Sequence, residues 1–221
     1  QYCEQNKFPL SPLQNAYLIG GEANCELGNS SAHYYIEYDA ANIDVKRLEA
    51  VINQLIQQHD VMRMVILKEG KNLTLQHLPT YRLAAYEYYD TGKRHQVREQ
   101  WRDHNYETGL WPMFHFEVGK SKRHSDVLHI SFDCLILDAW SAKRLIDEIF
   151  TLYQGNIVNY PEYTFRRYME EAADYQSKTN QSAYDYWVKQ LKLVSVPSLP
   201  TKRALAEVVK PRFERVEHCF T

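Results

Sequence analysis

The sequence predicts an α+β fold in which a mixed, largely antiparallel sheet carries helices on its faces. Short runs of alternating or wholly apolar residues are typical of strands, and longer segments between them repeat their apolar residues at helical spacing. Charged turns join two pairs of neighbouring strand segments, which indicates antiparallel hairpins. The chain has 221 residues, of which 44% are hydrophobic, so it can bury a substantial core.

Composition excludes several classes of protein. With 26 basic and 28 acidic residues the net charge is only -2, so the chain lacks the basic field that attracts nucleic acids. It has no apolar run near the roughly 20 residues of a membrane helix, and its first residues lack the apolar core of a signal peptide. We therefore expect a cytoplasmic protein that binds neither nucleic acid nor membrane. The cysteines, Cys3, Cys25, Cys134 and Cys219, are scattered, so we expect free thiols and no metal site.

Strands and helices are predicted along the whole chain. Ser11 and Pro12 form a helix start, because Ser is a preferred N-cap and Pro fits the first helical position. Further helices are predicted over 44–58, 91–108, 163–178 and 181–193, with another that ends near Gly155. Strands are predicted over 31–40, 59–66, 73–76, 81–90, 113–118, 127–132 and 213–220.

The chain is organised around residues 127–150, where an apolar strand leads through a turn into a helix. Asp133 and Asp138 stand in this turn with apolar residues between them. An unpaired buried carboxylate costs several kcal/mol, so each of the two must face a cavity or have a partner.

The pattern Asp133-x-x-x-x-Asp138-x-x-Ser141 resembles the signature of the heterocyclisation domains of nonribosomal peptide synthetases. These domains are relatives of condensation domains, which carry His-His-x-x-x-Asp-Gly at the same place. Asp133 stands at the position of the first His, and Cys134 replaces the second, catalytic His. Asp138 keeps the Asp that both kinds of domain share.

Three other segments resemble motifs of the same family. Residues 8–20, Phe-Pro-Leu-Ser-x-x-Gln-x-Ala-Tyr-x-x-Gly, follow its opening motif, except that Ser11 replaces Thr and Gly21 replaces the Arg that comes next. His59, Met62 and Arg63 fall on its second motif, although Gln58 replaces the leading Arg. Residues 196–201 form a Leu-Pro segment similar to the third.

The resemblance implies the chloramphenicol acetyltransferase-like fold, whose full domain has two lobes with a tunnel between them. Residues 1–195 would form the N-terminal lobe, and residues 196–221 the crossover segment and the start of the C-terminal lobe. In such domains an Arg holds the shared Asp, so we expect Arg63 to pair with Asp138. The residues alone leave an alternative, in which Arg63 extends to solvent and Asp138 caps the following helix.

The resemblance also implies an activity. An acyl donor and a Cys, Ser or Thr, each held on the phosphopantetheine of a peptidyl or aryl carrier protein, would be condensed and then cyclodehydrated to a thiazoline or oxazoline. The domain would bind no cofactor of its own and would work beside an adenylation domain in making a siderophore or peptide product. The alternative is a non-catalytic lobe that docks carrier proteins, and we expect the isolated chain not to form heterocycles.

The same resemblance assigns roles to the motif residues. Asp133, at the strand end and facing the tunnel, is the candidate catalytic group if burial raises its pKa. Cys134 would be a partly buried thiol that lines the tunnel, because its apolar neighbours raise the pKa and lower its reactivity. Asp138 and Arg63 would be architectural, and Ser141 would cap the helix or line the tunnel floor.

Overall fold

The main sheet has four strands in the order β2-β7-β6-β5, and the central strand β7 carries the motif. The computed structural model describes residues 7–22, 25, 28, 30–195 and 200–209. The strands are β2 (His33–Ala40), β5 (Ala84–Glu87), β6 (Phe114–Lys120) and β7 (Asp126–Asp133). β7 is antiparallel to both β2 and β6, whereas β5 is parallel to β6. The predicted mixed, largely antiparallel sheet is therefore confirmed.

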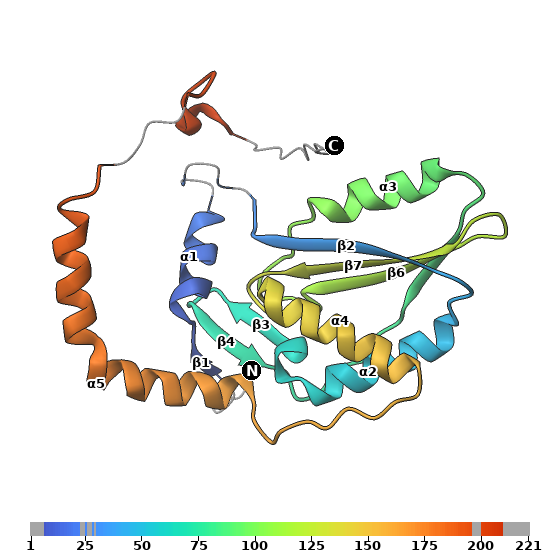
Figure 1. Ribbon diagram of the computed structural model, residues 1–221, viewed down its shortest axis with the longest axis horizontal. Coiled ribbons are helices and arrows are strands. Elements are labelled where there is room, and N and C mark those ends of the chain that lie inside the picture. The colour runs from blue at the N-terminus through green and yellow to red at the C-terminus, as the bar shows by residue number, and fades with distance from the viewer. Residues whose placement is uncertain (1–6, 23–24, 26–27, 29, 196–199, 210–221) are drawn as a thin grey trace, which may run out of the picture.

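A second, smaller sheet lies beside the first and has the order β1-β4-β3 (Figure 1). It consists of β1 (Lys7–Pro9), β3 (Met64–Leu67) and β4 (Lys71–Thr74), all antiparallel. β3 follows a short 3-10 helix, η2 (Asp60–Arg63), and joins β4 through a tight turn in which Gly70 has φ of +72°. This confirms the predicted hairpin; the strand β1 was not predicted.

Helices cover both faces of the main sheet. Those that do so are α2 (Val45–Gln58), α3 (Thr91–Arg102) and α4 (Ala139–Tyr153). The described residues also form α1 (Pro12–Gly20), α5 (Phe165–Leu191) and the short η3 (Leu205–Glu207). α2 and α4 pack against each other over one face, and α3 contacts β2 and β7 on the other (Figure 1). Ser11 caps α1 as predicted, because its side chain accepts the Gln14 N–H.

The hydrophobic core lies between the main sheet and the α2–α4 pair. Ile130 and Phe132 of β7 point into it and pack with apolar side chains of both helices. Side chains alternate along a strand, so Ser131 and Asp133 point to the opposite face, beneath α3. Both faces of β7 are buried: the face toward the two helices is apolar, and the face toward α3 carries polar side chains such as His129 and Ser131.

A dense polar layer fills the space between the sheet and α3. Glu37 of β2 accepts hydrogen bonds from Arg94 and Arg98 of α3 at 2.6–2.9 Å, and from the Tyr35 hydroxyl at 2.8 Å. Burial alone would raise the pKa of Glu37, but the hydrogen bonds from Arg98, His129 and Arg94 outweigh it and hold the pKa well below its usual range. These contacts attach α3 to the sheet.

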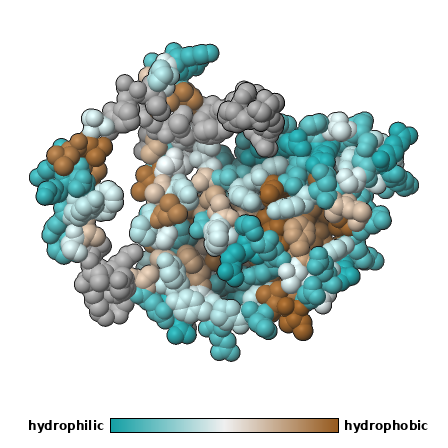
Figure 2. All heavy atoms as spheres, viewed as in Figure 1, coloured by the Kyte–Doolittle hydropathy of each residue, from teal (hydrophilic) through white to brown (hydrophobic). Residues whose placement is uncertain are grey.

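Helix α5 corrects one prediction. Two helices were predicted, over 163–178 and 181–193, but a single helix runs from Phe165 to Leu191. This segment contains no Gly or Pro, and the polar residues near position 180 cost at most about 0.7 kcal/mol each in a helix, which is too little to end it. The second half of α5 exposes large side chains, among them Tyr184, Trp187 and Leu191. Figure 2 shows brown, apolar surface near the C-terminal end of this helix.

Three further sequence predictions concern the end of α3, the last strand and membrane helices. α3 stops at Arg102, six residues before its predicted end at 108. The strand predicted over 213–220 lies outside the described residues, as does most of the segment 196–221. In the part of the chain that the structure describes, no helix is long and apolar enough to cross a membrane.

Candidate functional site

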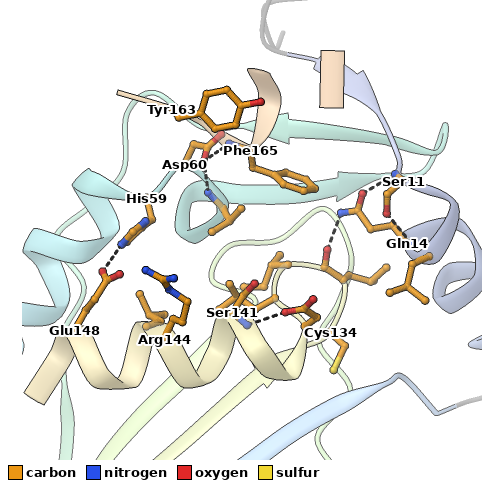
Figure 3. A pocket seen from close by; sticks show the side chains of 17 residues that line it. Ser11, Gln14, His59, Asp60, Cys134, Ser141, Arg144, Glu148, Tyr163 and Phe165 are labelled. Carbon is orange, nitrogen blue, oxygen red and sulfur yellow. Dashed lines mark hydrogen bonds and ion pairs between the residues drawn. The ribbon is translucent and has the colours of Figure 1, made fainter. Parts of the chain in front are cut away.

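A pocket of about 340 Å³ lies where the start of α4 meets α1, η2 and the start of α5 (Figure 3). Four segments that are far apart in the sequence form its walls. Its polar lining residues are Ser11, Gln14, His59, Asp60, Cys134, Asp138, Ser141, Arg144, Glu148 and Tyr163. The pocket therefore contains parts of all three motifs that fall on described residues.

The turn after β7 places Cys134 at this pocket. Asp133 Oδ1 accepts the Leu135 N–H at 2.8 Å, and the Asp133 carbonyl accepts the Ile136 N–H at 3.1 Å. The side chain and the backbone of Asp133 therefore both stabilise the turn. Gln14 of α1 donates to the Leu135 carbonyl at 2.7 Å, and its amide also exchanges two hydrogen bonds of 3.0 Å with Asn72. The opening motif thus holds the motif turn in place.

Asp133 itself does not line the pocket. Its residue is 1% exposed and lies directly across from His33 in the β2–β7 ladder. Burial raises the pKa of Asp133 to about 6, against smaller lowering effects of the Leu135 N–H and the Ser31 hydroxyl. Among the described residues, Oδ2 has no hydrogen-bond partner. The pKa of Asp133 is raised, as the catalytic prediction requires, and its side chain does not reach the pocket that Cys134 lines. Its expected orientation toward the tunnel between two lobes stays a prediction. A catalytic role stays a prediction, and the contacts favour a positioning role.

The predicted ion pair between Arg63 and Asp138 is wrong. Half-buried Arg63 donates from Nη1 to the carbonyls of Ile56, at 3.2 Å, and Gln57, at the end of α2. Asp138 is exposed and caps α4, accepting the Ser141 N–H at 2.7 Å. The two side chains form no ion pair in the structure described. Carbonyls at a helix C-terminus satisfy the guanidinium, and the N-terminus of α4 satisfies the carboxylate, so neither charge needs the other.

The alternative role for Asp138, that of helix cap, is confirmed. Ser141 does not cap the helix. Its backbone N–H donates the capping hydrogen bond to Asp138, and the residue lines the pocket. In the first turn of α4, Asp138 therefore caps the helix, and Ser141 lies at the pocket.

Cys134 is a half-buried free thiol, as predicted. Burial, followed by the charges of Asp133 and Asp138, raises the pKa of this thiol to about 11. A thiol with this pKa stays protonated at neutral pH and is a poor nucleophile. Cys25 is also a free thiol, and Cys3 and Cys219 lie outside the described residues.

Sequence reasoning missed the part that three ionisable residues play in the pocket. His59 Nε2 lies 2.7 Å from Glu148 Oε2, and the His59 ring meets the Tyr160 ring edge-on at 5.3 Å. Arg144 rises from α4 one turn before Glu148, toward the space between α4 and η2 (Figure 3). The spacing of Arg144 and Glu148 places them on one face of a helix. Nothing in the sequence pairs that face with His59.

Within the described ranges, no three His, Cys, Asp or Glu side chains come together in an arrangement that could hold a metal ion.

Comparison with known protein families identifies the family of this chain. A family model described as "Condensation domain" matches residues 4–216. The chain belongs to the condensation domain family. It is 27% identical to bacitracin synthase 1 of Bacillus licheniformis over 94% of its own length, which is 4% of that protein. It is 28% identical to pyochelin synthetase PchE of Pseudomonas aeruginosa, and 27% identical to phenyloxazoline synthase MbtB of Mycolicibacterium paratuberculosis.

These matches cover most of this condensation domain chain but little of its relatives. The aligned regions span 95% of the chain and 15% of PchE, and 89% of the chain and 18% of MbtB. Among solved structures, the cyclization-docking bidomain of EpoB from Sorangium cellulosum matches with a TM-score of 0.78 and 22% identity, over 92% of this chain and 42% of that one. The predicted family resemblance and the chloramphenicol acetyltransferase-like fold are confirmed.

Proposed function

We propose that this condensation domain chain is the N-terminal lobe of a heterocyclisation domain. Residues 1–195 would form the lobe, and residues 196–221 would lead into its second half. The full domain would join a carrier-bound acyl donor to carrier-bound Cys, Ser or Thr and close a thiazoline or oxazoline ring.

The observation that carries this proposal is the chemistry of position 134. An ordinary condensing enzyme of this family would have its catalytic His there, and this chain has a thiol whose pKa is raised to about 11. Such a thiol cannot replace imidazole as a base near pH 7. The names of a phenyloxazoline synthase and of a cyclization domain among the similar proteins support the same proposal.

The proposed reaction has two stages. The acceptor amine attacks the donor thioester, so that a C–N bond forms, the C–S bond breaks and the donor carrier thiol leaves with a proton. The acceptor side-chain thiol or hydroxyl then attacks the new amide carbonyl, and the carbonyl oxygen leaves as water while a C=N bond forms. Both stages need substrates held in a fixed relative orientation, which a rigid sheet and its anchored turn can provide.

The proposal names its partners by their chemistry. Donor and acceptor would arrive on the phosphopantetheine of peptidyl or aryl carrier domains, and an adenylation domain would load at least one of them. The domain itself would hold no cofactor. A cytoplasmic location, where such assembly lines find ATP and amino acids, stays part of the proposal.

Mass spectrometry of the complete domain tests the proposed function. The domain containing this chain is incubated with a donor carrier and an acceptor carrier that bears Cys, and the acceptor-bound product is weighed. We expect the amide product minus one water. An acceptor loaded with Ala is the matched control, because it can form the amide but cannot cyclise. A stable linear amide with Cys would indicate plain condensation, and carrier binding without any transfer would support the non-catalytic docking lobe.

A further inference from the structure

Asn72 is a fully buried polar residue in the middle strand of the small sheet, and it belongs to none of the sequence motifs. It lies on β4 between Phe8 of β1 and Ile66 of β3. A buried amide costs stability unless its polar atoms have partners. Asn72 Nδ2 donates to the Pro9 carbonyl at 2.9 Å and to Gln14 Oε1 at 3.0 Å, and Asn72 Oδ1 accepts from Gln14 Nε2 at 3.0 Å. Two of these three hydrogen bonds go to one side chain, that of Gln14.

The orientation of the Gln14 amide is fixed by partners of opposite kinds (Figure 3). The Ser11 N–H can only donate, and Gln14 Oε1 accepts it at 2.9 Å. The Leu135 carbonyl can only accept, and Gln14 Nε2 donates to it at 2.7 Å. The Asn72 amide fills the remaining donor and acceptor positions of Gln14. Turning either amide over would place like groups against each other, so the pair has one arrangement.

This amide pair connects the small sheet to the turn that carries Cys134. Leu135 directly follows Cys134, and its N–H donates to Asp133 Oδ1 while its carbonyl accepts from Gln14. The turn is therefore held by the main sheet on one side and by α1 on the other. Asn72 is not among the described residues that line the pocket, and it is too deeply buried to meet a substrate. Its effect on the pocket must pass through Gln14.

We propose that Asn72 is a positioning residue, which fixes the amide of Gln14 and thereby holds the turn with Cys134 at the pocket. The small sheet then has a role in the site, although none of its described strands lines the pocket. For turnover, this inference rests on the proposed function. The position of the turn can be measured without it.

Alkylation of Cys134 in the folded chain measures the position of the turn. Asn72→Leu is compared with the parent chain, and peptide mass spectrometry separates the rate at Cys134 from that at Cys25. Loss of the amide frees the turn and exposes the half-buried thiol, so we expect the rate at Cys134 to rise at least about fivefold, with that at Cys25 unchanged. Asn72→Ser, which keeps one hydroxyl, should cause a smaller rise and replaces Asn72→Leu if that variant does not fold.

Asn53→Leu is the matched control. The Asn53 amide also makes three hydrogen bonds, with the Glu49 carbonyl at 2.8 Å and with the Tyr81 backbone at 2.9 Å twice, but it lies on α2 away from the pocket lining. This variant should lose stability in urea and leave the rate at Cys134 within about twofold of the parent. Equal rises in Asn72→Leu and Asn53→Leu would show that alkylation reports lost stability alone, and would overturn the proposal. An unchanged rate at Cys134 in both Asn72 variants would also overturn it.

A double change tests whether Asn72 acts through Gln14. Gln14→Leu removes the hydrogen bond to the Leu135 carbonyl. Because the two residues would then no longer be linked to the turn, adding Asn72→Leu should not change the rate at Cys134 further. Effects that add up in the double variant would contradict the proposed route.

The complete domain separates this inference from the proposed function. Asn72→Leu should lower kcat about tenfold and leave KM for the acceptor carrier within about twofold, because a buried residue offers no surface on which a carrier could dock. A heterocycle formed with unchanged kcat would overturn the inference and leave the proposed function standing. Linear amide alone, with the alkylation rates as expected, would support the inference and refute heterocyclisation.

Discussion

The buried carboxyl of Asp133 should make the stability of the chain depend on pH in a specific direction. Burial raises the pKa of Asp133 from an ordinary value of 3.8 to about 6. Between these values the folded protein holds a proton that the unfolded protein has lost. Stability contributed by this group is therefore complete at low pH, falls as the pH rises from about 4 to about 6, and stays low above that range. A rise of about two pH units corresponds to ~3 kcal/mol.

Asp133→Asn removes this titration and keeps the local hydrogen bond. The amide oxygen can still accept the Leu135 N–H, which Oδ1 accepts at 2.8 Å, but the side chain cannot ionise. We expect the variant to gain stability over the parent as the pH rises from about 4 to 7, by up to ~3 kcal/mol. Urea denaturation of both proteins at several pH values measures this difference, in which the titration of other groups largely cancels.

Asp133→Ala is the control for the turn itself. It also removes the charge, but it leaves the Leu135 N–H without its acceptor, which should cost about 1–3 kcal/mol relative to Asn at every pH. A difference between Asp133→Asn and the parent that does not change with pH would refute the reasoning.

Three further predictions concern the helix cap, the polar layer and the thiol. Asp138→Ala should lower the free energy of unfolding by about 1 kcal/mol, because the helix loses its N-cap. A double-mutant cycle with Arg63→Ala should give a coupling energy below about 0.5 kcal/mol. A larger coupling energy would indicate that the two side chains form an ion pair. Glu37→Gln should lower the free energy of unfolding, measured by urea denaturation, by about 2–4 kcal/mol, because two arginines lose the anion that they share. The matched change at an exposed residue, Asp147→Asn, should alter it little. Equal effects of the two changes would contradict this expectation. Cys134 should react with iodoacetamide much more slowly in the folded protein than in the unfolded one, because a pKa of about 11 leaves on the order of one thiol in ten thousand ionised at pH 7. Cys134→Ala should also keep most of the activity of the complete domain. An acyl adduct trapped on this thiol would contradict both expectations.

Elements with local signals could be predicted from the sequence. The Ser11 cap with Pro12, the apolar stripe of α2 and the apolar run of β7 each depend on residues within one element, and all three are present as expected. The fold class followed from the order of these elements. Strand β1 escaped prediction because three residues that end in Pro give no recognisable period.

The partner of Arg63 could not be predicted, although its need for acceptors could. A search among charged side chains finds Asp138, whereas the acceptors are the carbonyls of Ile56 and Gln57. Every helix ends in carbonyls that lack an intrahelical partner, and these acceptors belong to no particular residue type. Sequence patterns that consider only side chains therefore miss them. The contact between His59 and Glu148 was missed for a different reason, since 89 positions separate the two residues and neither belongs to a shared pattern.

The alternation of β7 separates the roles of the two adjacent motif positions. His129 and Ser131 point beneath α3, where they bond Tyr35 and Tyr106 at 2.6 Å each, and Asp133 continues this polar face. The turn that begins with Asp133 then delivers Cys134 to the pocket on the other side. The first position of the motif therefore shapes the turn, whereas the second lies at the pocket. Under the proposed function, the second position would face the substrates, so a protonated thiol in place of a basic imidazole there would bear more on the type of reaction than the Asp that precedes it.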